Sequence, residues 1–181
     1  WFHAASIGEV QSIFPIIKKL NDDTKNLEFL ITTVTLSSGD LIKKKITQYS
    51  NIRHRYFPLD IKFLMKKFLK KWKPNLIIFV DSEIWPNLLM EIKKNKIPSA
   101  IINGRITKKT FKRWMLISVF AKKIFNIFDL CLASSNESKK YLERLNAKNL
   151  KYIGNIKLAG TINENSITNK NKNILNKKKF W

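Results

Sequence analysis

Short apolar runs alternate with longer stretches of helical periodicity along most of this chain, and this alternation restricts its fold more than any other feature. Strands are predicted at residues 2–5, 28–34, 53–57, 76–80, 99–103, 130–133 and 151–153. Helices are predicted at residues 10–20, 40–49, 61–72, 85–94, 109–127 and 137–145. Strands separated by helices of this length imply repeated βαβ units. The sequence therefore predicts an α/β fold with a Rossmann-like, doubly wound parallel sheet.

Glycine and polar residues gather where the predicted strands end. The chain has five glycines, and four of them follow predicted strands: Gly8, Gly39, Gly104 and Gly154. Glycine at such turns favours a close backbone approach or a positive φ. Because open α/β sheets bind ligands at the carboxyl ends of their strands, we expect the site at this edge. The polar residues there include Ser6, Ser37, Ser38, Asp60 and Ser82, and turn formation or helix capping explains some of them equally well.

Composition indicates the kind of partner rather than its identity. Hydrophobic residues make up 44% of the 181 residues, which is enough for a substantial core. Lys and Arg total 35 against 13 acids, a formal charge of +22 that favours nucleic acid, a phospholipid surface or a phosphorylated substrate. One cysteine, Cys131, excludes an internal disulfide and is expected to be buried. With only two histidines, no metal site is predicted.

Two segments bear on organisation and membrane contact. Residues 111–128 are the most apolar stretch, but four cations interrupt it, so we expect a helix with basic flanks. Membrane contact and a buried core helix with snorkelling lysines both remain open for it. Residues 161–181 are rich in Asn and Lys and resemble a linker. We therefore expect one domain over residues 1–160 and a linker, 161–181, towards a further domain.

The segment 3–10, HAASIGEV, ends an apolar run in a small-residue turn and places Glu9 where a helix should begin. The unpaired N–H groups of a first helical turn favour an ionised acid there. Glu9 could thus complement the helix dipole or face a ligand.

Two further segments place polar and aromatic side chains on the same edge of the predicted sheet. The segment 81–87, DSEIWPN, follows a predicted strand, and Pro86 suits the first turn of a helix. Trp85 offers a flat surface beside two carboxylates, which suits a sugar site, or it could anchor the helix to the sheet. The segment 103–105, NGR, adds the Arg105 guanidinium, suited to phosphate or carboxylate.

Together, the segments HAASIGEV, DSEIWPN, NGRIT (103–107) and GNIK (154–157) resemble one family in order and spacing. Over residues 1–160 the chain is similar to the N-terminal domain of the 3-deoxy-D-manno-octulosonic acid (Kdo) transferases of lipopolysaccharide synthesis. Thr32-Thr33 and the segment FPLD (57–60) fit the same pattern. The resemblance implies the N-terminal half of a GT-B glycosyltransferase, whose two Rossmann-like domains enclose the active site.

By this resemblance, the enzyme would transfer Kdo from CMP-Kdo to a hydroxyl of the phosphorylated lipid A precursor, without a metal or another cofactor. Glu9 matches the family's proposed general base, and Glu83 matches an important acid of its second motif. The expected substrate-binding residues are Ser6, Gly8, Asp81, Trp85, Asn87, Arg105, Asn155 and Lys157. The resemblance also implies a membrane-associated enzyme at the cytoplasmic face of the bacterial inner membrane, with no nucleic-acid partner.

The sequence departs from the family at two places. Asp81-Ser82-Glu83 stands where Glu-Thr-Glu is more usual, and Lys109 stands where the family has an arginine. The donor-binding domain of the family is expected to lie outside this chain, so we expect no turnover by the chain alone. Two alternatives remain: another GT-B glycosyltransferase or sugar-nucleotide enzyme, and a basic nucleic-acid-binding module.

Overall fold

The computed structural model describes residues 1–159, which form one seven-stranded parallel sheet. Its strands are β1 (Phe2–His3), β2 (Phe29–Thr33), β3 (Ile52–Tyr56), β4 (Ile77–Val80), β5 (Ser99–Gly104), β6 (Leu130–Ala133) and β7 (Leu150–Tyr152). Their order is β3-β2-β1-β4-β5-β6-β7, and every pairing is parallel. The chain reverses its direction of winding between β1 and β4, which makes this pair the topological switch point of the sheet. The predicted doubly wound fold is confirmed.

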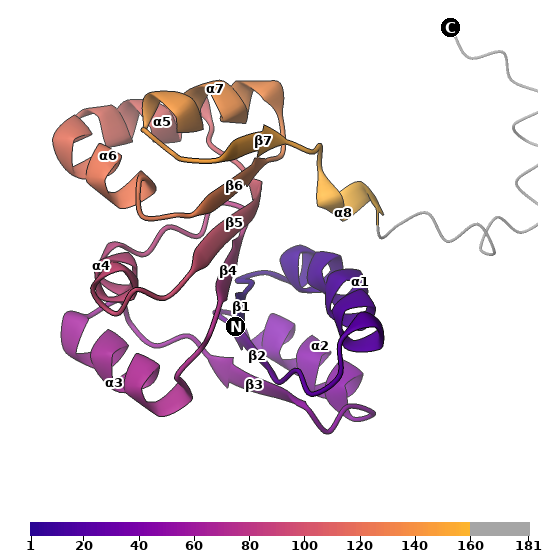
Figure 1. Cartoon of the computed structure of the whole chain (residues 1–181). Coiled ribbons are helices and arrows are strands. Elements are labelled where there is room, and N and C mark those ends of the chain that lie inside the picture. The colour runs from indigo at the N-terminus through magenta and orange to yellow at the C-terminus, as the bar shows by residue number, and fades with distance from the viewer. Residues whose placement is uncertain (160–181) are drawn as a thin grey trace, which may run out of the picture.

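Helices cover both faces of the sheet (Figure 1). They are α1 (Ile7–Asp23), α2 (Leu36–Ile46), α3 (Lys62–Trp72), α4 (Pro86–Lys94), α5 (Lys108–Met115), α6 (Ser118–Phe125), α7 (Asn136–Arg144) and the short α8 (Ile156–Ala159). Helices α1 and α2 pack on one face, whereas α3, α4 and α6 pack on the other. The predicted linker, 161–181, lies outside the described residues.

Alternation along the strands builds a separate core on each face. In β4, Ile77 and Phe79 pack towards α3 and α4, while Val80 packs with the residues of α1. In β5, Ile101 packs with the residues of α3 and α4, whereas Ile102 packs with those of α1. Because both faces of the sheet are covered, the inner strands β2, β4 and β5 are buried along most of their length. The edge strands differ, since β3 exposes Arg53 and Arg55 and β7 exposes Lys151.

The helix predicted over residues 109–127 is wrong in one respect, because the structure divides it into α5 and α6. Ile117 between them leaves helical geometry, with φ −121° and ψ 45°. The break lets α5 stack Phe111 on Tyr141 of α7, at 4.6 Å between ring centroids, while α6 packs against α4. A straight helix could not reach both partners.

Helix beginnings and glycine geometry also differ from expectation. Helix α2 begins at Leu36, so Gly39 is helical and contacts the Tyr56 ring instead of forming a turn. Among the four glycines at strand ends, only Gly154 has a positive φ, of 81°. Left-handed backbone occurs instead at Asp81 and Asn103, with φ of 64° and 54°.

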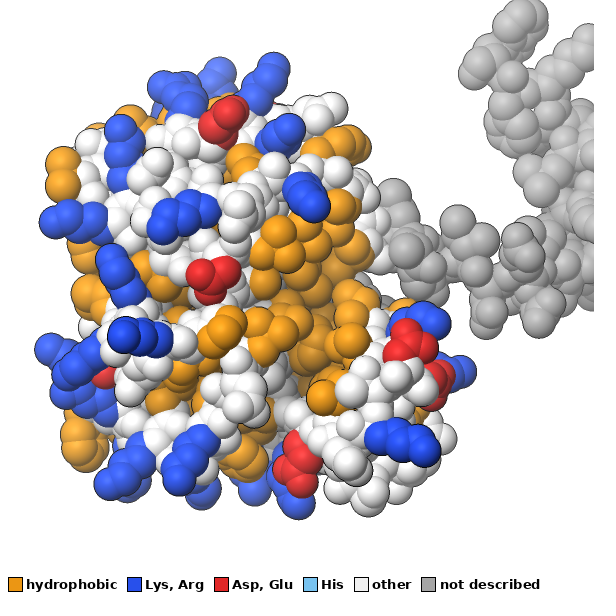
Figure 2. All heavy atoms as spheres, viewed as in Figure 1, with side chains coloured by type: hydrophobic (Ala, Val, Ile, Leu, Met, Phe, Trp, Pro, Cys, Tyr) orange, Lys and Arg blue, Asp and Glu red, His pale blue; other side chains and the backbone are white. Residues whose placement is uncertain are grey.

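Helix α3 buries Met65 and Leu69 and leaves Phe63 exposed. Within the described residues, no helix is both long and apolar enough to cross a membrane. In the view of Figure 2, Lys and Arg side chains lie mainly around the outline, and hydrophobic side chains gather in the middle.

Candidate active site

Glu9 lies in the first turn of α1, at the carboxyl end of β1. Ser6 is the N-cap of this helix, and its hydroxyl accepts a bond from the Glu9 N–H. The Glu9 carboxylate accepts bonds from the Ser6 hydroxyl at 2.7 Å and from the Ala5 N–H at 2.8 Å. This reciprocal arrangement is a variant of the capping box. It fixes the carboxylate at the sheet edge.

The environment of Glu9 suits a proton acceptor. Its side chain is buried, and this burial raises the pKa of the carboxyl above the ordinary value of 4.5. The hydrogen bonds from Ser6 and Ala5 oppose the rise, while the negative charges of Glu83 and Asp81 add to it. A carboxylate with a raised pKa binds a proton more readily near neutral pH.

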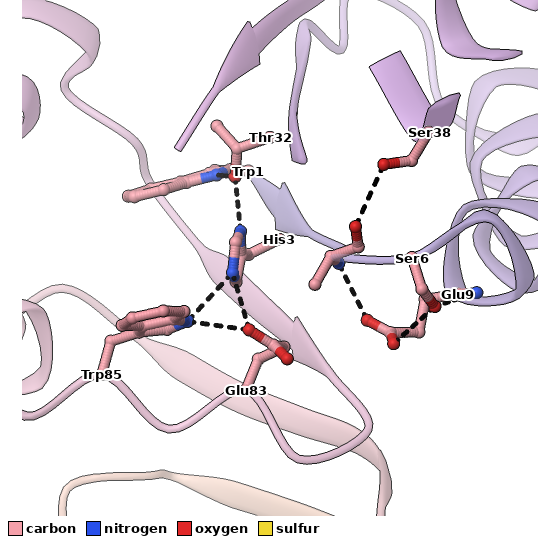
Figure 3. Close-up of polar contacts among 9 residues, drawn as sticks. Trp1, His3, Ser6, Glu9, Thr32, Ser38, Glu83 and Trp85 are labelled. Atoms are coloured by element: carbon pink, nitrogen blue, oxygen red, sulfur yellow. Dashed lines mark hydrogen bonds and ion pairs between the residues drawn. The ribbon is translucent and has the colours of Figure 1, made fainter. Parts of the chain in front are cut away.

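Glu83 belongs to a second hydrogen-bonded group, centred on the fully buried His3 (Figure 3). The Nε2 atom of His3 lies 3.2 Å from Glu83 Oε2, and Nδ1 lies 2.9 Å from the Thr32 hydroxyl. The Trp85 indole N–H lies 3.0 Å from both His3 Nε2 and Glu83 Oε2. An ionised Glu83 needs a proton on Nε2, because two lone pairs at this distance would repel. Thr32 then donates its proton to Nδ1, and His3 and Trp85 both donate to Glu83.

Neighbouring aromatic rings and a distant loop fix the segment that carries Glu83. Trp85 packs on Phe57 at 4.9 Å and meets the His3 ring edge-on. Asp60 accepts the backbone N–H bonds of Asn87 and Leu88, each at 2.9 Å. The predicted substrate-binding residue Asn87 is thus held by Asp60, at the beginning of α4.

Asp81 and Lys157 form an ion pair of 2.6 Å between the end of β4 and α8. Asn103 accepts the Ile156 N–H at 3.1 Å. Asp81 and Asn103, which are both buried and both have a left-handed backbone, thus hold α8 on the sheet. Non-glycine residues in this conformation store strain, which is common at functional sites.

The remaining predicted residues divide between two cavities that share Lys157. Arg105 and Asn155 line a cavity of about 500 Å³ together with Asp81. Gly8 lines another, of about 850 Å³, between α1 and α2. A Cβ atom at position 8 would have no neighbouring atom within 4 Å, so packing does not require a glycine there. Among the described residues, no group of three His, Cys, Asp or Glu side chains could hold a metal ion.

The structure brings most of the predicted residues to one edge, around the β1–β4 switch point. A family profile described as 3-deoxy-D-manno-octulosonic-acid transferase (kdotransferase) matches residues 1–159. The chain belongs to the Kdo transferase family. A probable mitochondrial member from Arabidopsis thaliana is 40% identical over 114 residues, which is 63% of this chain and 25% of that protein.

Bacterial members match more of the chain. The Kdo transferase of Rickettsia prowazekii is 33% identical over 95% of this chain and 36% of its own length. That of Haemophilus influenzae is 31% identical over 87% of this chain and 37% of its own length. The chain therefore spans at most about two-fifths of these relatives.

Solved structures confirm the GT-B-like, Rossmann-like fold. The UDP-GlcNAc 2-epimerase of Neisseria meningitidis, bound to UDP-GlcNAc, has a TM-score of 0.62 at 12% identity. It matches 97% of this chain and 52% of its own. The S. aureus MnaA–UDP co-structure has a TM-score of 0.60 at 15% identity and matches 98% of this chain and 50% of its own. At these identities the likeness concerns the fold alone.

The sequence placed Asp60 at the expected edge and included His3 and Thr32 in the family's motifs, but it predicted no contact of these three residues within the site. The spacing Ser6-x-x-Glu9 is a readable capping-box pattern that foretells the Ser6–Glu9 contact. No local pattern could reveal the contact between His3 and Glu83, because 80 residues separate them. The strand order of the sheet creates it.

Proposed function

We propose that this chain is the acceptor-binding half of a glycosyltransferase that moves Kdo from CMP-Kdo to a hydroxyl of a phosphorylated lipid A precursor. The match of residues 1–159 to the Kdo transferase family carries this proposal. The geometry at the switch point supports it, since Glu9 combines burial, a fixed position and a raised pKa. The donor domain of the complete enzyme would form the opposite wall.

In the proposed reaction, Glu9 accepts the proton of the acceptor hydroxyl while that oxygen forms a bond to the anomeric carbon of Kdo. The bond between Kdo and CMP breaks, and CMP leaves with the electron pair. The Ser6 hydroxyl and the Ala5 N–H orient the Glu9 carboxylate throughout. Glu83, held by His3 and Trp85, adds a second carboxylate that raises the proton affinity of Glu9.

A donor comparison on the full-length enzyme tests this proposal. With the lipid A precursor as acceptor, we expect CMP release from CMP-Kdo and no turnover of UDP-GlcNAc. Turnover of the UDP-sugar alone would instead support a sugar-nucleotide enzyme of the kind that shares this fold. The 181-residue chain by itself should release no CMP.

We further propose that the enzyme acts at the cytoplasmic face of the inner membrane and contacts it through the elbow between α5 and α6. Leu116 is 85% exposed and Val119 is 71% exposed, and Ile117 between them is also exposed. Lys112, Arg113, Lys122 and Lys123 flank this elbow. Exposed apolar residues beside cations match the interface of an anionic bilayer.

Vesicle sedimentation tests the membrane proposal. The chain should bind phosphatidylglycerol vesicles more tightly than phosphatidylcholine vesicles, and the double substitution Leu116→Asp with Val119→Asp should abolish the binding. Exposed Leu76, on the amino side of the sheet, offers a control substitution, Leu76→Asp. Binding that persists in the double variant would contradict a role for the elbow.

A further inference from the structure

The cavity of about 500 Å³ at the carboxyl ends of β4, β5 and β6 differs in chemistry from an apolar ligand pocket. Its lining includes a single apolar residue, Ile106, which is itself buried beneath the surface. The other lining residues carry hydroxyl, amide or charged groups. Its volume falls within the range of small-molecule sites, and its walls suit a hydrophilic ligand.

The charged residues of this cavity leave two cations available. Lys157 and Asp81 neutralise each other at 2.6 Å. Glu137 accepts a hydrogen bond from the neutral Tyr141 hydroxyl and keeps its negative charge, so the cavity has one acid without an ion pair against two such cations among the described residues. Neither Arg105 nor Lys108 has a side-chain hydrogen bond or ion pair with any residue from 1 to 159. An anionic group entering the cavity would therefore meet an uncommitted guanidinium and an uncommitted ammonium.

The backbone presents Arg105 from a fixed position. Its N–H donates to the Asp81 carbonyl oxygen at 3.3 Å. The next residue, Ile106, donates its N–H to the Ser138 hydroxyl at 3.1 Å, and its side chain is buried. Because the backbone N–H groups of Arg105 and Ile106 are both anchored, the backbone that carries the guanidinium needs little ordering when an oxyanion binds.

Two helices begin at the same cavity and add favourable dipoles. Thr107, the N-cap of α5, and Ser135, the N-cap of α7, both line it. The first N–H groups of each helix lack intrahelical acceptors, so the positive ends of both dipoles lie beside Arg105. Asn155 and Ser134 supply neutral hydrogen-bonding groups for hydroxyls.

From these features we infer that the cavity binds a sugar bearing an oxyanion, with Arg105 and Lys108 as the principal contacts. Arg105 can form a bidentate pair with a phosphate or carboxylate, while Lys108 acts as a point charge. The inference deepens the proposed function, on which its biological meaning rests. Under that function the oxyanion is either the phosphate of the acceptor or the carboxylate of the donor sugar.

Direct binding to the 181-residue chain tests the inference without turnover. The probes are N-acetylglucosamine 1-phosphate, free Kdo, and uncharged N-acetylglucosamine, measured by calorimetry at low salt. We expect at least one anionic sugar to bind at least tenfold more tightly than the uncharged one. Binding of the phosphate probe alone assigns the cavity to the acceptor, and binding of Kdo alone assigns it to the donor.

Matched variants make the result specific to the cavity. Arg105→Gln should weaken binding of the anionic sugar at least tenfold, and Lys108→Gln should weaken it severalfold. Arg53→Gln removes the same charge from a residue that lines a different cavity, beside the amino end of β4, and should leave binding unchanged. Thermal unfolding of each variant checks that the fold is retained.

The inference is overturned if neither anionic sugar binds more tightly than the uncharged one. It is also overturned if Arg105→Gln and Arg53→Gln change binding equally. Failure of the proposed function has a separate readout, the release of CMP by the full-length enzyme. The two failures can thus be told apart.

Discussion

Asp60 allows a sharp test of how the fold supports the site. Helix α4 has Trp85 at its N-cap, which provides no side-chain cap, and Asp60 supplies this function from the loop after β3. Asp60→Ala removes a carboxylate that accepts the N–H bonds of Asn87 and Leu88 and faces the positive end of the helix dipole. The substitution therefore disturbs the segment that carries Glu83.

The expected loss follows from these contacts. A lost helix cap costs about 1 kcal/mol, hydrogen bonds to a charged group cost about 1.5–3 kcal/mol, and the dipole adds a few tenths. Because these terms overlap, we expect Asp60→Ala to lower the free energy of unfolding by about 2–3 kcal/mol. For a domain of this size, that loss corresponds to a fall in Tm of about 5–10 °C.

Urea unfolding of the 181-residue chain, followed by circular dichroism, measures this loss. Asp40→Ala is the matched control, since Asp40 pairs with Lys43 on the surface of α2 with both side chains more than 60% exposed. Such pairs contribute little, so the control should lose under about 0.5 kcal/mol. Equal losses in the two variants would refute the tertiary capping of α4 by Asp60.

Four other predictions concern the site and the core. Because burial raises the pKa of Glu9, the acidic limb of kcat/KM in the full-length enzyme should have its midpoint above the ordinary value of 4.5, as activity requires the ionised form; a midpoint at or below that value would contradict the role of burial. The same shift means that ionisation of Glu9 disfavours the folded state, so the free energy of unfolding should decrease as pH rises from 4.5 through the raised pKa. In a series of unfolding measurements at different pH, Glu9→Gln should remove this decrease. His3→Gln, which can retain an N–H donor to Glu83, should preserve more kcat than His3→Leu, and identical losses in kcat would argue against positioning through this bond. Burial raises the pKa of Cys131 to about 12, so a thiol reagent should modify it only as fast as the domain opens, and rapid labelling of the folded chain would contradict its burial.

The strands and the edge that carries the site were predictable from local patterns. All seven strands were predicted. Short apolar runs mark the inner strands, because both faces of a parallel sheet are buried there, whereas the edge strands β3 and β7 carry exposed charged residues. Glu9 and Glu83 were placed correctly at this edge, since the position after a parallel strand is set by topology. Their roles in catalysis remain predictions.

Tertiary packing decides the features that the sequence did not predict. The break at Ile117 lets α5 and α6 meet different partners, although the apolar periodicity continues across it. The ion pair of Asp81 with Lys157 joins residues 76 positions apart and depends on the left-handed backbone of Asp81, which no local pattern predicts. The bond from His3 to Glu83 requires β1 and β4 to be neighbours in the sheet.

Transfer activity of Glu9→Gln in the full-length enzyme tests the central claim most directly. Glutamine can still accept the Ala5 N–H bond, so the fold should remain, but it cannot take a proton at neutral pH. Removing a general base costs about 10²–10⁴-fold, and we expect Kdo transfer to fall by this factor. Glu28→Gln, an exposed acid just before β2, is the control and should retain full activity. Transfer by Glu9→Gln within tenfold of the unaltered enzyme would contradict the assignment of Glu9 as the base.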